Sequence, residues 1–178
     1  MSSRLVLVLG GTRSGKSRFG VRRAAELATD GAVTYLATAR PGDPELDERI
    51  RAHRRDRPGG WSTVDVGDDL AATIRSAGAS STLLLDGLTL WLSAIAGDLP
   101  ADVDAILDGP FAAALEAIDA HQGAIVVVSD EIGLGMVPLD PVGRRFRDLL
   151  GIAHQRLAAR ADEAYLLVAG MPLKLRGA

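Results

Sequence analysis

The chain has 178 residues, of which 47% are apolar and 24% are charged, as in an ordinary globular protein of one domain. Its net charge of −3 argues against a protein that binds nucleic acid through bulk electrostatic attraction. The sequence contains no cysteine, which excludes disulfides and cysteine-ligated metals. The apolar run near the N-terminus, LVLVL, is too short for a signal peptide or a membrane span, so we expect a cytoplasmic protein.

Strand and helix patterns alternate along the chain. Continuous aliphatic and β-branched runs predict buried strands at residues 5–9, 32–38, 82–87, 124–131 and 163–170. Amphipathic or charge-rich segments predict helices at residues 16–28, 44–57, 69–77, 101–121 and 142–161. This order predicts an α/β fold with a mostly parallel sheet and helices on both of its faces. Because no repeat or change of composition divides the chain, we expect residues 1–178 to form one nucleotide-binding domain.

A glycine-rich loop joins the first predicted strand to the first predicted helix. It matches the P-loop pattern G-x-x-x-x-G-K-[ST], and it has the strand before it and the helix after it that a P-loop requires. Backbone N–H groups of such a loop and the positive end of the helix form a site for phosphate. We therefore expect a nucleoside triphosphate to bind here, with lysine on the β- and γ-phosphates and serine on Mg²⁺. The loop consists of Gly10, Gly11, Thr12, Arg13, Ser14, Gly15, Lys16 and Ser17.

Three carboxylates close two of the predicted strands. Asp86 ends TLLLD and is the first candidate for holding Mg²⁺, because a P-loop site needs an acid at the end of a neighbouring strand. A turn-forming aspartate before Gly87 is the alternative interpretation of Asp86. Asp130 and Glu131 end AIVVVSDE, and capping or loop bonding competes there about equally with a catalytic role.

A histidine, His53, stands among five arginines in the segment RIRAHRRDRP. Taken alone, such a segment is typical of a solvated helix surface. The alternative is a nucleophile, because histidine is mostly neutral at pH 7 and neutral imidazole attacks phosphorus readily, with arginines to bind the phosphates. The other two histidines, His121 and His154, are interpreted as structural, the first at a helix end and the second beside an apolar stripe.

The order of these segments resembles one family over nearly the whole chain. The matching segments are GGTRSGKS, YLATA, RIRAHRRDRP followed by tryptophan, LLLDGLTLWL, VVVSDEIGLGMVP and GRRFRDLLGIAHQRLAARADEAYLLVAG. Together they resemble the bifunctional adenosylcobinamide kinase/adenosylcobinamide-phosphate guanylyltransferase family of cobalamin biosynthesis. A P-loop is shared with many kinases and ATPases, whereas the RI-x-x-H and E-[IV]-G-x-G-x-V-P segments are much more selective.

The resemblance implies two activities and a RecA-like P-loop fold. In the first, ATP or GTP phosphorylates the aminopropanol hydroxyl of adenosylcobinamide. In the second, GMP passes from GTP through a guanylyl-histidine to adenosylcobinamide phosphate, which yields adenosylcobinamide-GDP and pyrophosphate. The family's guanylylated histidine corresponds to His53 in this chain. The resemblance also implies a homotrimer.

The resemblance further implies a set of site residues. His53, Lys16 and Asp86 would be catalytic, and Ser17 and Asp86 would hold Mg²⁺. The nucleotide would contact the P-loop and the residues Ala37, Thr38, Ala39, Arg54, Arg55, Asp56, Arg57, Asp65 and Asp86.

Two positions depart from the family, and two other functions remain open. Some relatives carry a second histidine where this chain has Ala52, and relatives often have asparagine where it has Asp130. Asparagine donates a hydrogen bond that an ionised aspartate does not, so the role of Asp130 is open. The alternatives are a monofunctional small-molecule P-loop kinase with His53 on its surface, and a RecA-type ATPase subunit that moves a partner.

Overall fold

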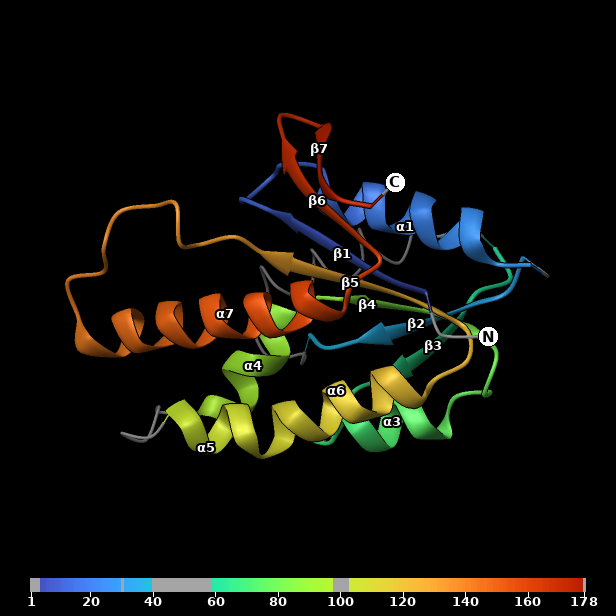
Figure 1. The fold of residues 1–178 in the computed structure, drawn as a ribbon, viewed down its shortest axis with the longest axis horizontal. Helices are drawn as coiled ribbons and strands as arrows, with labels where there is room; N and C mark the ends of the chain where they lie inside the picture. Colours follow the sequence, from blue (N-terminus) through green and yellow to red (C-terminus); the bar gives the residue numbers. More distant parts are fainter. Residues whose placement is uncertain (1–3, 30, 40–58, 98–102, 178) are drawn as a thin grey trace.

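The computed structural model describes residues 4–29, 31–39, 59–97 and 103–177, which fold as a sheet with helices on both faces (Figure 1). The strands are β1 (Arg4–Gly10), β2 (Val33–Ala37), β3 (Ser62–Asp65), β4 (Thr82–Asp86), β5 (Ala124–Asp130), β6 (Glu163–Val168) and β7 (Met171–Arg176). The helices are α1 (Lys16–Leu27), α3 (Leu70–Ser76), α4 (Leu88–Ala96), α5 (Val103–Asp108), α6 (Pro110–Ala120) and α7 (Pro141–Arg160).

The seven described strands form one sheet in the order β3-β2-β4-β5-β1-β6-β7. Neighbouring strands from β3 to β6 are parallel, and β7 alone runs antiparallel to its neighbour, β6. The central strands β1, β4 and β5 are almost fully buried, which is the reason for their continuous aliphatic sequences.

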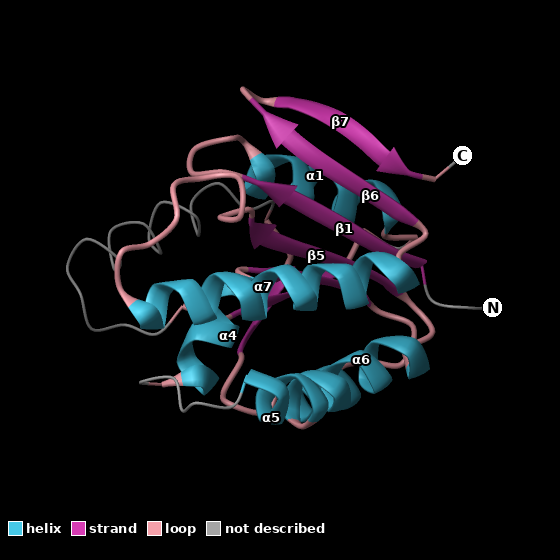
Figure 2. Ribbon diagram, turned by 60° about the vertical axis from the view of Figure 1, so that its left-hand side comes forward, coloured by secondary structure: helices cyan, strands magenta, loops and turns pink. Residues whose placement is uncertain are grey.

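Two apolar cores lie on opposite faces of the sheet. On one face, α1 packs against alternate strand residues such as Val6, Leu84 and Val126. On the other, α3, α4, α5, α6 and α7 cover the intervening residues, among them Leu7 and Leu85. Figure 2 shows α7, α5 and α6 in front of the sheet and α1 behind it. The predicted fold class, a mostly parallel α/β sheet with helices on both faces and a P-loop after its first strand, is confirmed.

The five predicted strands are confirmed, with ends that differ by up to two residues, and so are the helices at 16–28, 69–77 and 142–161. The prediction at 101–121 was wrong in one respect, because α5 ends at Asp108 and α6 starts at Pro110, where proline suits the first turn of a new helix. The predicted helix at 44–57 lies outside the described residues.

The sequence analysis missed three elements. The four residues of β3 are all exposed and therefore lack the apolar run of a buried strand. The strand β7 contains Pro172 and follows a tight turn in which Ala169 and Gly170 both have positive φ, a turn that suits a hairpin. The helix α4 was left unassigned although its nine residues follow Gly87 directly. Among the described residues, no helix is long and apolar enough to span a membrane.

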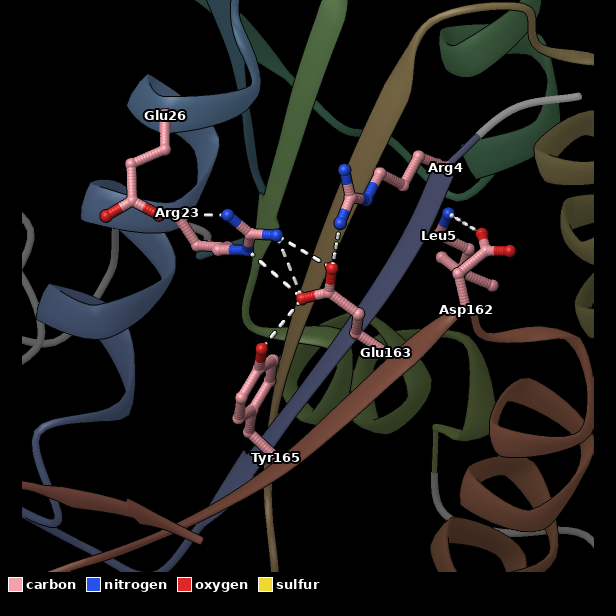
Figure 3. A network of polar contacts seen from close by, with 7 residues as sticks. All are labelled: Arg4, Leu5, Arg23, Glu26, Asp162, Glu163 and Tyr165. Carbon is pink, nitrogen blue, oxygen red and sulfur yellow. Dashed lines mark hydrogen bonds and ion pairs between the residues drawn. The ribbon is translucent and has the colours of Figure 1, made fainter. Parts of the chain in front are cut away.

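A buried carboxylate ties β1, β6 and α1 together at the amino ends of the parallel strands (Figure 3). Glu163, the first residue of β6, accepts hydrogen bonds from Arg23 at 2.7 and 2.9 Å. It also accepts from Tyr165 at 2.8 Å and from Arg4. Burial by itself would raise the pKa of Glu163, but the hydrogen bonds from Arg23, Tyr165 and Arg4 outweigh it and lower the pKa to about 2.

This network predicts a loss of stability in acid. The pKa of Glu163 is about 2 in the folded chain, against 4.5 for the unfolded reference. The stability that its ionised carboxylate contributes is therefore present above pH 4.5 and is lost as the pH falls towards 2. The shift corresponds to roughly 3 kcal/mol of unfolding free energy. We expect urea unfolding at pH 7 to show Glu163→Gln destabilised by about 2–3 kcal/mol, with the difference from wild type shrinking between pH 5 and pH 3.

The matched control is Glu26→Gln, because Glu26 also pairs with Arg23 but is half exposed. It should change the unfolding free energy by less than about 1 kcal/mol. A constant difference between wild type and Glu163→Gln from pH 5 to pH 3 would contradict the assignment.

Candidate active site

The predicted site residues that the structure describes lie at one edge of the sheet, where the parallel strands have their carboxyl ends. Gly10 of β1 is in register with Asp130 of β5, and Ala37 of β2 is in register with both Asp86 of β4 and Asp65 of β3. In an open α/β sheet this edge is where ligands bind. The sheet therefore brings together five candidate segments that are far apart in the sequence.

The loop between β1 and α1 has the backbone conformation of a tight phosphate-binding turn. Arg13 and Gly15 have φ values of 57° and 92°, and Ser14 N–H donates to the carbonyl of Gly11 at 3.2 Å. Glycine suits position 15 because φ is positive there, and an added Cβ would also lie in tight contact, 3.3 Å from Cα of Gly170. The N–H of Gly170 donates to the carbonyl of Ser14 at 2.8 Å, so the β6–β7 turn supports the loop from the side.

The lysine of this loop is held within the site. Lys16 Nζ lies 2.6 Å from Oδ1 of Asp130 and 3.2 Å from the carbonyl oxygen of Gly11. The Lys16 side chain is 14% exposed and that of Asp130 is 34% exposed, so the pair lines the accessible side of the loop. A phosphate bound by the loop would share this lysine with the aspartate.

A hydroxyl and a carboxylate meet beside the loop. Ser17 Oγ donates to Oδ1 of Asp86 at 3.1 Å, and the hydroxyl of Tyr35 donates to Oδ2 at 3.0 Å. Such oxygen ligands suit Mg²⁺, which usually takes one or two protein ligands and completes its shell with water and phosphate oxygens. No group of three or more His, Cys, Asp or Glu side chains that could hold a metal ion occurs within the described residues. Tyr35 was not predicted, because nothing in its strand distinguishes it from a core residue.

Thr38 lies next to this pair, and Asp65 lies on the same edge of the sheet. Thr38 is buried, and its Oγ1 donates to the carbonyl of Gly87 at 2.9 Å, which ties the end of β2 to the end of β4. A side chain on Gly87 would collide with that hydroxyl, since its Cβ would lie 2.6 Å from Thr38 Oγ1. Asp65 is exposed at the carboxyl end of β3, one strand further from the loop.

Five of the predicted site residues lie outside the part of the chain that the structure describes. They are His53, Arg54, Arg55, Asp56 and Arg57.

The two acids that end β5 have different surroundings. Asp130 faces Lys16 on the side of α1, whereas Glu131 faces α7, where its Oε2 lies 3.6 Å from Nδ1 of His154. Glu131 Oε1 accepts the N–H of Gly133 at 2.5 Å, so its carboxylate is engaged in starting the next loop. Asp130 therefore pairs with the P-loop lysine, and Glu131 makes the loop hydrogen bond that the sequence left as one of two alternatives.

A chain of hydrogen-bonded polar side chains ends at the backbone of Asp130, at the carboxyl end of β5. The sequence analysis did not predict the roles of its two hydroxyl residues, Ser129 and Thr89. His154 Nε2 lies 2.8 Å from Ser129 Oγ, which lies 3.0 Å from Thr89 Oγ1. Thr89 Oγ1 accepts the N–H of Asp130 at 2.8 Å. Burial lowers the pKa of His154, although the nearby charge of Glu131 opposes this, so the imidazole is neutral at pH 7 and acts as a structural group.

The remaining histidine is also structural. His121 ends α6 and is buried, with Nε2 2.7 Å from the carbonyl oxygen of Ser81. The interpretation of both His121 and His154 from the sequence is therefore confirmed.

Comparison with known proteins identifies the family. The profile of the family described as "Cobinamide kinase / cobinamide phosphate guanyltransferase" matches residues 6–175. The chain belongs to this family. The Bifunctional adenosylcobalamin biosynthesis protein CobP of Pseudomonas aeruginosa is 46% identical over 172 residues, which cover 96% of each chain. The Bifunctional adenosylcobalamin biosynthesis proteins CobU of Escherichia coli and Salmonella typhimurium are each 33% identical over 184 residues, covering 97% of this chain and 99% of theirs.

Solved structures of other proteins are much more distant. The flagellar accessory protein FlaH of Methanocaldococcus jannaschii is 14% identical, with a TM-score of 0.49 over 98% of this chain and 78% of its own. A KaiC-like protein of Pyrococcus horikoshii has the same identity and a TM-score of 0.48, over 93% and 71%. Similarity of this degree says nothing about the active site of this chain.

The ion pair between Lys16 and Asp130 yields a prediction. A nucleoside triphosphate must bring its phosphates to a lysine that already has a carboxylate partner, and that carboxylate repels them. We expect Asp130→Asn to bind Mg²⁺–GTP about three- to tenfold more tightly, measured by isothermal titration calorimetry. The matched control is Glu131→Gln, which neutralises the adjacent acid on the other face of the sheet and should leave the affinity within about twofold. Weaker binding by Asp130→Asn would show that the carboxylate assists the nucleotide instead.

Proposed function

We propose that the chain is a bifunctional enzyme that phosphorylates adenosylcobinamide and then transfers GMP to the product. The observation that carries the proposal is the convergence of Lys16 with the Ser17–Asp86 pair beside a P-loop, in a chain that matches the cobinamide kinase family over residues 6–175. We expect it to act in the cytoplasm as a homotrimer, with ATP or GTP as the nucleotide and Mg²⁺ as the metal.

In the kinase step, the hydroxyl oxygen of adenosylcobinamide attacks the γ-phosphorus of the nucleotide. The bond from that phosphorus to the bridging oxygen breaks, its electron pair stays on the departing nucleoside diphosphate, and the hydroxyl proton leaves to solvent or a nearby base. Lys16 and the N–H groups of the P-loop neutralise charge on the β- and γ-phosphates. Ser17 and Asp86 would hold Mg²⁺, which supplies further positive charge on the same oxygens.

In the transfer step, an imidazole nitrogen of His53 attacks the α-phosphorus of GTP and pyrophosphate leaves with the electrons of the broken bond. A phosphate oxygen of adenosylcobinamide phosphate then attacks the same phosphorus and releases the imidazole. The P-loop suits this step too, because it grips the β- and γ-phosphates that depart as pyrophosphate. The arginines at positions 54, 55 and 57 would bind phosphate oxygens beside the histidine.

The covalent step is tested with GTP labelled at the α-phosphorus. We expect wild type to acquire label that is stable in alkali and released by acid, as a phosphorus–nitrogen bond requires. The His53→Ala variant should acquire none and lose guanylyl transfer while it still phosphorylates adenosylcobinamide. Label that persists in His53→Ala would refute the assignment, and a wild type that shows kinase activity without any adduct would be the monofunctional kinase.

The shared phosphate site is tested with the only two lysines of the chain, Lys16 and Lys174. Because both steps place charge on the same phosphates, Lys16→Ala should lower kcat/KM of the kinase and the transferase by about 10²–10³-fold each. Lys174→Ala, on strand β7, is the matched control and should leave both within about twofold. Retention of either activity by Lys16→Ala would show that the two reactions use separate sites.

A further inference from the structure

The segment that joins β5 to α7 begins directly after the acids at the end of β5 and exposes large apolar side chains. Within residues 132–139, which we term the apolar loop, Leu134 is 80% exposed, Met136 94%, Val137 62% and Leu139 97%. In Figure 1 this orange segment leaves the tip of β5 and swings out beyond the carboxyl edge of the sheet before it enters α7. Adjacent exposed apolar residues of this kind usually mark a binding surface.

The backbone of the apolar loop is held in place from within the protein. At its start, Arg147 donates to the carbonyl of Gly133 at 2.5 Å, and Glu131 accepts the N–H of the same residue. At its end, Arg144 donates to the carbonyls of Pro138 at 3.0 Å and Leu139 at 2.6 Å. Polar groups thus bind the inner side of the loop while its apolar side chains stay outside. The surface is prepared in advance, so little ordering cost would oppose binding.

The position of the apolar loop follows from the active site itself. It begins two residues after Asp130, whose carboxylate contacts the P-loop lysine at 2.6 Å. An acceptor hydroxyl must lie in line with the γ-phosphate that this lysine binds. The rest of a large acceptor must then lie outside the carboxyl edge of the sheet, the edge from which the chain continues from Asp130 into the apolar loop.

We propose that the apolar loop binds the corrin ring of the acceptor, with Leu134 and Met136 against its apolar carbon surface. The proposal rests on the proposed function, since it takes adenosylcobinamide as the acceptor. The aliphatic side chains and the unbranched methionine suit a large, uneven ring, because methionine adapts its shape to its partner. The same surface would serve both steps, since the phosphorylated product keeps the ring.

A second copy of the chain is the competing occupant, and another surface fits it better. Strand β7 lies at the end of the sheet order and exposes Met171, Leu173 and Leu175 by 56–67%. Two strands, β1 and β6, separate it from β5. Contact between copies through β7 would leave the apolar loop free for the acceptor.

The test compares three full-length proteins by calorimetric titration with adenosylcobinamide and, separately, with Mg²⁺–GTP. We expect the double variant Leu134→Ser/Met136→Ser to bind adenosylcobinamide about tenfold more weakly than wild type, and GTP within about twofold, because only the apolar contact is lost. Conservative exchange, Leu134→Met/Met136→Leu, should restore the affinity, since volume and apolar character are kept. The molar mass from light scattering should be the same for all three.

The control variant is Leu173→Ser, which removes an equally apolar and 57% exposed side chain from β7. It should leave the affinity for adenosylcobinamide unchanged. Equal affinities of wild type and the double variant, or a lower molar mass of the double variant, would overturn the proposal, the second outcome assigning the apolar loop to contact between copies. A wild type that binds GTP but no adenosylcobinamide would refute the proposed function itself.

Discussion

The pairing of β1 with β5 is the interaction on which the active site depends. Parallel register places Gly10 opposite Asp130, so the strand that enters the P-loop and the strand that carries the acid end at the same height. Lys16, which starts the helix after the loop, then reaches Asp130 within 2.6 Å. A shift of one residue in this register would turn Asp130 to the other face of the sheet and remove it from the lysine. The buried aliphatic residues of both strands prevent such a shift, because it would exchange the contents of the two cores.

Side chains alternate between the two faces of a strand, so neighbouring residues at the carboxyl end of β5 have different partners. Ser129 and Glu131 face α7, where they meet His154, and Asp130 between them faces α1. The α1 side therefore carries the ion pair of Asp130 with Lys16, and the α7 side carries a buried polar chain with a neutral imidazole. The apolar loop leaves from this end of β5, and the hydrogen bonds of Glu131 and Arg147 to Gly133 hold its start. Catalysis and acceptor binding would in this way share one strand end.

Helix α1 connects the active site with the stabilising network at the opposite edge. Its first residues, Lys16 and Ser17, meet acids at the carboxyl ends of the strands. Two turns later, Arg23 binds Glu163 at the amino end of β6. The helix is therefore attached to the sheet by charged groups at both ends and by apolar packing in between. A phosphate site needs this fixed placement, since its N–H groups act on charge only when they do not have to reorganise.

The sequence by itself determined the features that depend on local order. The glycine pattern between a strand and a helix identified the P-loop, the aliphatic runs identified five strands, and Asp86 stood out because it closes one of them. Family-specific segments added the activity, and the match over residues 6–175 confirmed the family. The short exposed strand β3 and the hairpin strand β7 were not predicted, because neither has a continuous apolar run.

Only the tertiary structure decided which of these residues meet. Tyr35 binds Asp86 across 51 positions and Arg23 binds Glu163 across 140, and no spacing in the chain encodes such pairs. The sequence left the roles of Asp130 and Glu131 open for the same reason, since adjacent residues of a strand point to opposite faces and their partners come from distant segments. Sheet register and the packing of α1 and α7 on opposite faces supplied those partners.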